Sequence, residues 1–572
     1  MIFFSLLNSK LKLSFFKLIF LMFLLGILEV AVLGSIIPLT QALIDKNIIL
    51  RNEYLSFIIN YLNLNENYIL IYICILFLVL VFLKTFFSIY VNFLKHRTSN
   101  ELRLSISKNF IYKFILGNTN ISSIKKHFLS NIYYREIPNF VDQFFVNFLL
   151  LATEVITFLF IIVFLFWFSF KSTLIVFFII SFLIITYFFF VGKIFKKNGK
   201  KRLLAEQSIS KWIVQILNEI RDIKIFNRER YFFTEFTNSY KTLIKSIILG
   251  SALNESSKNI IEFICFTLLV VVIIFASLND INNEILLLTL SVFAGAAFRL
   301  MPSANRILTC LQTIKFNKEA AKKLLELLDN KIMDNMDLSI FDVKNKLNFS
   351  DKIMLKNVSF SYDESSKVIF KNLNFSIKKN SIIGIQGESG SGKTTLINLI
   401  SGLIGVKEGA VYADNVNIET NLIGWRANIG YIPQKLLLSN DSILKNIAFG
   451  KEDNEINLEN IKKAIDLSKL ISLEKDSYLE FINSDAGYLG EKLSGGQIQR
   501  IALARVLYLE KDIFILDEAT SALDKKIEKE ILDLIYSFKN KKTILIISHD
   551  EHVLDRCDKI YLLKNYNLVE KK

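Results

Sequence analysis

The chain has 572 residues, 52% of them apolar and 51 of them phenylalanine, and it carries a formal net charge of +15. An apolar excess of this size is typical of membrane proteins and excludes an ordinary soluble enzyme. The basic residues gather beside apolar segments rather than in a separate basic domain, so we expect no nucleic-acid partner.

Apolar runs that are long enough to cross a bilayer occur only in the first part of the chain. About 20 apolar residues span the hydrocarbon core. We therefore predict six transmembrane helices, at 14–43, 68–94, 143–168, 172–194, 259–279 and 284–312. The first run follows three lysines, as in a signal peptide. It is too long for one and contains Glu29 and Pro38, so we expect it to be retained.

The connections between these runs indicate how the chain is oriented in the membrane. Lysine and arginine crowd 95–142 and 195–258, whereas "SLNDINNE" between the fifth and sixth runs has neither. The positive-inside rule therefore places both termini in the cytoplasm. The two basic connections contain no proline except Pro138, and we expect them to extend the spans into the cytosol as helices.

The connection after the first run, 44–67, is expected to lie outside. Its apolar residues between 50 and 62 fall on one face of a helix. That helix either lies in the membrane interface or packs on its own protein, and the pattern does not decide between the two. The four cysteines lack metal-ligand spacing, so neither zinc nor a disulfide is expected.

The pattern changes after the sixth run. We divide the chain into a six-helix membrane domain at 1–317, a charged linker at 318–350 and a second domain at 351–572. In the second domain, short runs rich in β-branched residues alternate with helical ones. The predicted fold is therefore a polytopic α-helical membrane domain followed by an α/β domain with a largely parallel sheet.

The stretch "GESGSGKTT" follows a predicted strand and precedes a predicted helix, which is the context of a phosphate-binding loop. Glycines allow successive backbone N–H groups to surround phosphate at a helix N-terminus. Lys393 is placed to reach the β- and γ-phosphates of ATP, and the Thr394 hydroxyl to hold Mg²⁺. The nucleotide-binding residues expected here are Gly387, Glu388, Ser389, Gly390, Ser391, Gly392, Lys393, Thr394 and Thr395.

The stretch "IFILDE" supplies two acids at the end of a buried strand. Ligands bind at the carboxyl ends of strands in open α/β sheets. Asp517 is suited to hold Mg²⁺, and Glu518 to act as a base toward the attacking water.

Between these elements stands "LSGGQIQR", the signature of the ATPases of ATP-binding-cassette (ABC) transporters. Six spans ahead of one such ATPase domain resemble an ABC exporter half-transporter over nearly the whole chain. The resemblance implies a dimer that sandwiches two ATP molecules, and because this chain carries every residue needed for hydrolysis, we expect it to pair with itself, with a sister subunit as the alternative. Each would lie between one subunit's phosphate loop and the other's signature, which here is Leu493, Ser494, Gly495, Gly496 and Gln497.

The same resemblance implies roles for four further residues. Tyr362 would stack on adenine, although an ordinary strand tyrosine is the alternative. Gln434 would touch Mg²⁺ and the attacking water, and Asp524 would lie in the loop that crosses the dimer interface. His549 would contact the γ-phosphate. Glu518, His549 and Gln434 are thus the expected catalytic residues, and Thr394, Gln434 and Asp517 the expected Mg²⁺ ligands.

The sequence departs from the family in two places. Where exporters have an acid before the signature, this chain has Tyr488, and His549 is followed by Asp550 instead of arginine. The resemblance also implies that the turns near 118–124 and 219–226 dock on ATPase domains; the alternative is a pair of solvated helix bends.

The cargo is indicated by "FRLMPSANRI" at the end of the sixth run. It resembles the same region of PglK-type flippases of lipid-linked oligosaccharides. Arg299 and Arg306 lie about two turns apart and are the candidate pyrophosphate ligands. Alternatively, they pair with the acids of other spans, which are Glu29, Glu154 and Glu262, or their long side chains reach to the membrane interface.

The sequence therefore predicts an ATP-driven flippase of a bacterial inner membrane. It would move a polyprenyl-pyrophosphate-linked oligosaccharide from the cytoplasmic to the outer leaflet. An exporter of another lipid, a polysaccharide precursor or a drug-like amphiphile is the alternative. A membrane ATPase that gates or senses without pumping is a second alternative, of another class.

Overall fold

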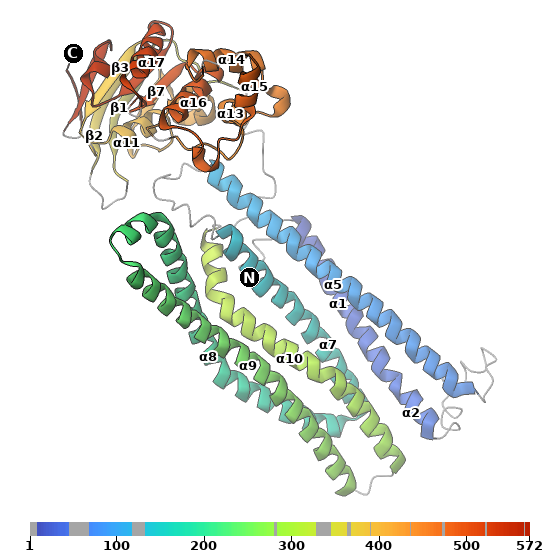
Figure 1. Ribbon diagram of the computed structural model, residues 1–572. Coiled ribbons are helices and arrows are strands. Elements are labelled where there is room, and N and C mark those ends of the chain that lie inside the picture. The colour runs from blue at the N-terminus through green and yellow to red at the C-terminus, as the bar shows by residue number, and fades with distance from the viewer. Residues whose placement is uncertain are drawn as a thin grey trace. The chain divides into compact units, whose positions relative to one another are not determined.

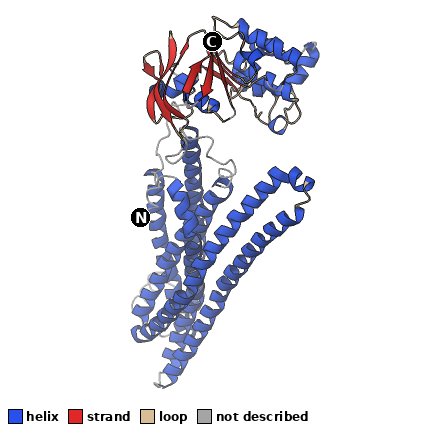
Figure 2. Cartoon of the chain, turned by 90° about the vertical axis from the view of Figure 1, so that its left-hand side faces the viewer, coloured by secondary structure: helices blue, strands red, loops and turns tan. Residues whose placement is uncertain are grey.

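The structure is a computed structural model that describes residues 9–44, 68–116, 132–278, 283–327, 345–362, 368–388, 390–434, 436–471, 475–520, 523–564 and 567–571. The chain divides into two compact units, a helical one that ends with α10 and a second one described from residue 345 onward. Every strand in the described part of the chain belongs to the second unit (Figure 2).

The helical unit consists of long rods (Figure 1). They are α1 (Ser9–Gly34), α2 (Ile36–Ile44), α5 (Ile69–Leu116), α7 (Val146–Phe168), α8 (Phe170–Ile225), α9 (Glu229–Leu278) and α10 (Asn283–Leu327). Two π-helical stretches, η3 (Ile132–Glu136) and η4 (Asn139–Phe145), precede α7. The helices that were expected to extend the spans are thus present in α5, α8 and α9. The expected interfacial helix at 50–62 and the turn at 118–124 lie outside the described residues.

Four helical segments of the described chain are long and apolar enough to cross a membrane: Ser9–Ile44, Ile69–Ile115, Ile132–Phe168 and Leu287–Lys318. The expected span 172–194 lies within α8, and the expected span 259–279 lies within α9 as far as Leu278, the last described residue of that helix. The first span is interrupted at Ser35, between α1 and α2. Pro38 follows in the first turn of α2, where a missing N–H is tolerated.

α10 is the central helix of this unit, because it packs against α7, α8 and α9. α8 and α9 lie side by side. The Asn198 amide donates to the Ser246 carbonyl at 2.7 Å, and the Ser208 and Ser239 hydroxyls are 3.0 Å apart. α8 bends at Glu219, and Asn227 makes the turn to α9 with φ of 51°. The turn expected near 219–226 is therefore a helix end in this structure.

The second unit contains two sheets. Its strands are β1 (Lys352–Phe360), β2 (Phe370–Lys378), β3 (Ile382–Gly387), β4 (Glu408–Ala413), β5 (Val416–Asn417), β6 (Ile429–Ile432), β7 (Ile513–Asp517), β8 (Thr543–Ile547), β9 (Lys559–Lys564) and β10 (Asn567–Glu570). The smaller sheet is antiparallel, in the order β2-β1-β4-β5. The larger one has the order β10-β9-β3-β8-β7-β6 and is parallel except for β10. The predicted fold class is confirmed.

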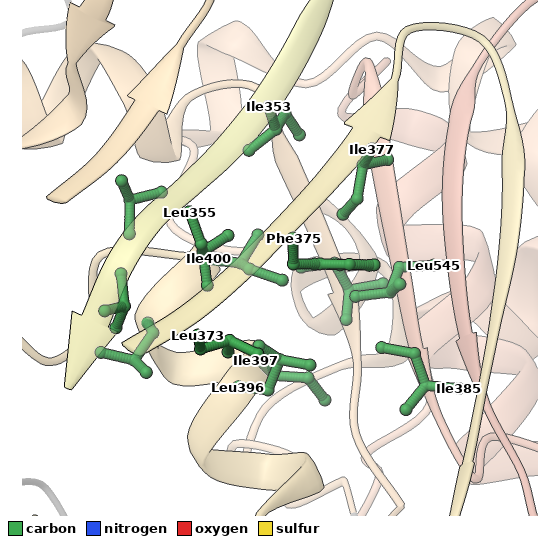
Figure 3. Close-up of a cluster of buried hydrophobic side chains, with 14 of the residues drawn as sticks. Ile353, Leu355, Leu373, Phe375, Ile377, Ile385, Leu396, Ile397, Ile400 and Leu545 are labelled. Carbon is green, nitrogen blue, oxygen red and sulfur yellow. The ribbon is translucent and has the colours of Figure 1, made fainter. Parts of the chain in front are cut away.

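The helices of this unit are α11 (Lys393–Ile400), α12 (Leu422–Arg426), α13 (Ile443–Ala448), α14 (Leu458–Leu467), α15 (Lys475–Asn483), α16 (Gly495–Tyr508), α17 (Lys525–Ser537) and α18 (Glu551–Leu554). α11 packs into a buried core between the two sheets (Figure 3). Leu396, Ile397 and Ile400 of α11 meet Leu355 and Phe375 of the antiparallel sheet in that core. Full burial of such side chains contributes about 1.5–3 kcal/mol each, which fixes the helix that begins at the phosphate loop.

Candidate functional site

The phosphate loop joins β3 to α11. Gly390 and Gly392 have φ of 77° and 107°, in the left-handed region that glycine adopts without strain. A Cβ on Gly392 would also lie 2.8 Å from Ile369 Cγ2, so a side chain does not fit there. The Lys393 ammonium donates to the carbonyls of Gly387 at 2.6 Å and Glu388 at 3.1 Å, which holds it over the loop.

The parallel sheet brings four predicted residues to one edge. Gly387 ends β3 and Asp517 ends β7, whereas His549 and Gln434 stand two residues beyond β8 and β6. These strands are neighbours in the order β3-β8-β7-β6. Because they are parallel, their carboxyl ends meet at the same edge, where open α/β sheets bind ligands.

Glu518 lies between two of the other candidate residues. One of its carboxylate oxygens accepts a hydrogen bond from Gln434 Nε2 at 2.5 Å, and the other lies 3.0 Å from His549 Nδ1. Its backbone is in the left-handed region, with φ of 49°, and its N–H donates to the Ile547 carbonyl at 3.0 Å. A non-glycine residue held in this conformation marks a site where the surrounding fold imposes the side chain's direction.

Asp517 is the more buried of the two acids. Burial raises the pKa of this carboxyl above its usual range, and the charge of Glu518 acts in the same direction. A hydrogen bond from the Tyr431 hydroxyl, at 3.1 Å, and the charge of Lys393 lower the pKa of Asp517 in part. A divalent cation would compensate the buried charge fully, so the site fits Mg²⁺.

The signature residues begin α16. Ser494 caps this helix: its hydroxyl accepts from the Gln497 N–H at 3.2 Å, and its own N–H donates to the Gln497 side chain at 2.9 Å. Gly495 and Gly496 form the first turn, directly after Leu493. The turn is therefore preorganised, and its N–H groups face outward along the helix axis, as an anion site at a helix N-terminus requires.

Two further predicted residues have structural partners. The Asp524 carboxylate caps α17 by accepting from the Ile527 N–H at 3.0 Å. The Tyr362 hydroxyl lies 3.1 Å from the Thr395 hydroxyl, next to the phosphate loop. Thr394 is exposed. Ser389 lies outside the described residues.

The two arginines of α10 pair with buried acids of other helices. Arg299 Nη2 lies 2.8 Å from Glu29 of α1, and Arg306 Nη1 lies 2.7 Å from Glu154 of α7. Glu154 also accepts from the Ser303 hydroxyl at 2.7 Å. The structure thus shows the acid pairing that the sequence left open as an alternative, and it selects Glu29 and Glu154 from the three possible acids.

Sequence reasoning missed two residues of these clusters. Tyr431, the partner of Asp517, is one tyrosine in a strand and carries no distinguishing pattern. Lys84 of α5 lies 3.2 Å from Glu29. It was detectable in principle, because a lysine within an apolar run needs a partner in the membrane.

The site fits MgATP. In the described part of the loop, the Ser391 hydroxyl is buried and has no hydrogen-bond partner, so a polar ligand is needed to satisfy it. Lys393 and the loop amides would hold the phosphates, and Asp517 with Thr394 and Gln434 would hold Mg²⁺. Bound Mg²⁺ would neutralise charge on the phosphate oxygens.

Comparison with known families covers most of the chain. Residues 15–298 match the family described as ABC transporter transmembrane region, and residues 370–521 match the family described as ABC transporter. A solved bacterial Atm1-family ABC exporter with ATP bound has a similar fold. The TM-score is 0.74 at 19% sequence identity, over 99% of this chain and 95% of that one.

Curated relatives with similar sequences are named ATP-dependent lipid A-core flippases. The protein of Vibrio vulnificus (strain CMCP6) is 27% identical over 67% of this chain and 64% of its own length. That of Desulfotalea psychrophila is 29% identical over 66% and 65%. The protein of Burkholderia orbicola is 23% identical over 84% and 79%. The match thus spans just under two thirds of the length of the first two relatives.

Proposed function

Since the chain belongs to the ABC transporter family, as an exporter half-transporter with one membrane domain and one ATPase domain, we propose that it uses ATP hydrolysis to flip a lipid. The lipid we propose is an oligosaccharide on polyprenyl pyrophosphate, moved from the cytoplasmic to the outer leaflet of a bacterial inner membrane. One observation carries the cargo assignment: Arg299 and Lys84 meet one carboxylate between helices of the helical unit, which leaves a net positive charge.

Each ATPase residue has a distinct part in this function. Glu518 accepts a proton from the attacking water, and its contacts with Gln434 and His549 hold the carboxylate in place. Lys393 stabilises negative charge on the β- and γ-phosphates. Asp517 provides the charge that binds Mg²⁺, and Tyr431 fixes the direction of its carboxylate.

The protein would work as a homodimer. The helix N-terminus at Ser494 suits an anion, and among the described residues the Ser494 hydroxyl and N–H make their capping contacts with Gln497 of the same chain. In a dimer, it would meet the γ-phosphate held by the partner's phosphate loop. Because one chain carries the complete set of hydrolytic residues, both sites of a homodimer would be competent.

The cargo needs a charged path because pyrophosphate does not enter hydrocarbon unaided. A guanidinium binds phosphate oxygens in a bidentate manner, and lysine adds a point charge. The relatives support a lipid as cargo, since they are named for flipping lipid A-core. Those names also make lipid A-core the second candidate for this chain.

The test is ATP-dependent flipping in proteoliposomes that contain fluorescent lipid-linked oligosaccharide, with fluorescent lipid A-core in a parallel set. We expect the wild type to flip the oligosaccharide lipid and Glu518→Gln to flip neither. Flipping of lipid A-core alone would move the assignment to the second candidate. Hydrolysis of ATP without flipping of any lipid would favour a gate or sensor.

A further inference from the structure

A buried carboxylate joins two cations within the helical unit. The Glu29 side chain of α1 is only 4% exposed, and its Oε1 lies 3.2 Å from Lys84 Nζ and 2.8 Å from Arg299 Nη2. Arg299 Nε donates to the same oxygen at 3.0 Å. We call Glu29, Lys84 and Arg299 the outer triad. It holds one negative and two positive charges.

The outer triad keeps an uncompensated positive charge. Among the described residues, no acid other than Glu29 forms an ion pair with Lys84 or Arg299. Glu154 of α7, the other buried acid that pairs with an arginine of α10, is engaged by Ser303 on one oxygen and Arg306 on the other. A net charge at membrane depth is costly, so the triad favours an anionic ligand.

The geometry of the triad also favours displacement of Glu29. Both cations converge on one oxygen, Oε1, so Arg299 does not make the two parallel hydrogen bonds that a carboxylate or phosphate offers it. The cationic side chains are 25% and 21% exposed, whereas Glu29 is buried beside them. A ligand can therefore reach the cations without first reaching the carboxylate.

We propose that Glu29 is an internal counter-anion, which occupies Lys84 and Arg299 until the phosphate groups of a lipid displace it. The inference rests on the proposed function, because it assigns the regulation of the same cargo site. Glu29 lowers the affinity for phosphate lipids and thereby keeps the triad selective. A lipid with one weakly held phosphate competes poorly against the carboxylate, whereas a pyrophosphate spans both cations.

This competition has a measurable size. When the binding-competent form is only a fraction of the protein, the apparent dissociation constant rises by the inverse of that fraction. If Glu29 occupies the cations for about nine-tenths of the time, then removing its charge tightens lipid pyrophosphate binding about tenfold.

The experiment measures binding of undecaprenyl pyrophosphate to the full chain in phosphatidylcholine nanodiscs, without ATP, with undecaprenol as the uncharged control. We expect Glu29→Gln to tighten binding and Arg299→Gln and Lys84→Gln to weaken it. The gain from Glu29→Gln should disappear in the double variant Glu29→Gln/Arg299→Gln. A second set of nanodiscs with phosphatidylglycerol distinguishes the two sources of phosphate. We expect that bilayer lipid to compete more strongly in Glu29→Gln than in the wild type.

Glu154→Gln is the matched control, because it frees α10 from another buried acid. Equal tightening by Glu154→Gln and Glu29→Gln would mean that any loosening of α10 improves binding, and the inference would fail. Unchanged or weaker binding by Glu29→Gln would also overturn it. Binding that follows the expected pattern without ATP-dependent flipping would instead overturn the proposed function and leave the counter-anion role standing.

Discussion

The ATP site and the membrane charge clusters are assembled in different ways. In the ATP site, each residue that we assign to the phosphates, Mg²⁺ or the attacking water stands in a short motif, and the parallel sheet sets the ends of β3, β6, β7 and β8 at one edge. In the helical unit, Arg299 meets Glu29, 270 positions away in the sequence, through helix packing alone. The ATP site can therefore be recognised in the sequence from its motifs. The sequence shows the charges of the helical unit but not which of them pair.

The largest expected effect comes from removing the general base of the ATP site. Glu518→Gln should lower the rate of ATP hydrolysis by about 10²–10⁴-fold, because a positioned general base contributes this much. ATP binding should persist, since Lys393 and the loop are unchanged. Phosphate release and nucleotide binding by the reconstituted protein measure the two effects. Glu530→Gln, on the exposed face of α17, is the matched control, and a similar loss there would refute the assignment.

The ion pair between Arg299 and Glu29 in the helical unit can be tested by measuring the stability of the protein. Arg299→Leu leaves Glu29 with Lys84 alone, and we expect the free energy of unfolding to fall by about 3 kcal/mol or less, the scale of a broken buried pair. Thermal unfolding in detergent measures it. Phe298→Ala is the control, because that neighbouring side chain is 86% exposed. A loss of the same size there would show that the ion pair contributes nothing.

The ionisation of Asp517 makes the stability of the folded protein depend on pH, and the burial of its carboxyl decides the direction of that dependence. Its pKa is raised in the folded protein, so its stabilising contribution is complete at low pH and is lost as the pH rises through that pKa. At pH 7 without nucleotide, Asp517→Asn should therefore raise the melting temperature, and the difference should vanish toward pH 3. Tyr431→Phe should lower the melting temperature at pH 7, because the Tyr431 hydroxyl donates a hydrogen bond that stabilises the ionised Asp517 carboxylate.

With MgATP present the order of the Asp517 variants should reverse, because only the ionised wild type binds Mg²⁺ at full strength. Melting curves with and without MgATP measure both parts. A melting temperature of Asp517→Asn at or below that of the wild type without nucleotide would contradict the assigned cost of burial.

The smallest effect concerns the signature turn. Ser494→Ala removes the cap of α16 and should cost about 1 kcal/mol of stability in the ATPase unit. Ser494→Thr keeps a hydroxyl and should lose less. Chemical denaturation of the two variants provides the comparison. Equal losses would mean that the hydroxyl does not support the helix.

The sequence by itself determined the α/β fold of the second unit and the chemical groups of its ATP site. A strand that ends in Asp517, or a loop that ends in Lys393, carries its function in consecutive residues, and parallel strands bring such ends together without further information. Tyr431 escaped this reasoning, because a strand tyrosine gains its role only from the neighbouring strand that happens to end in an acid.

Only the tertiary structure decided the partners of Arg299 and Arg306. Helical periodicity places both arginines on a similar face of one helix, but it left three acids in other spans as possible partners. The packing of α10 against α7 and the nearness of α1 select Glu154 and Glu29. The physical reason is that a charge in a membrane helix needs a counter-charge. The sequence does not identify which helix supplies that counter-charge. Packing of side chains over long sequence separations makes that choice.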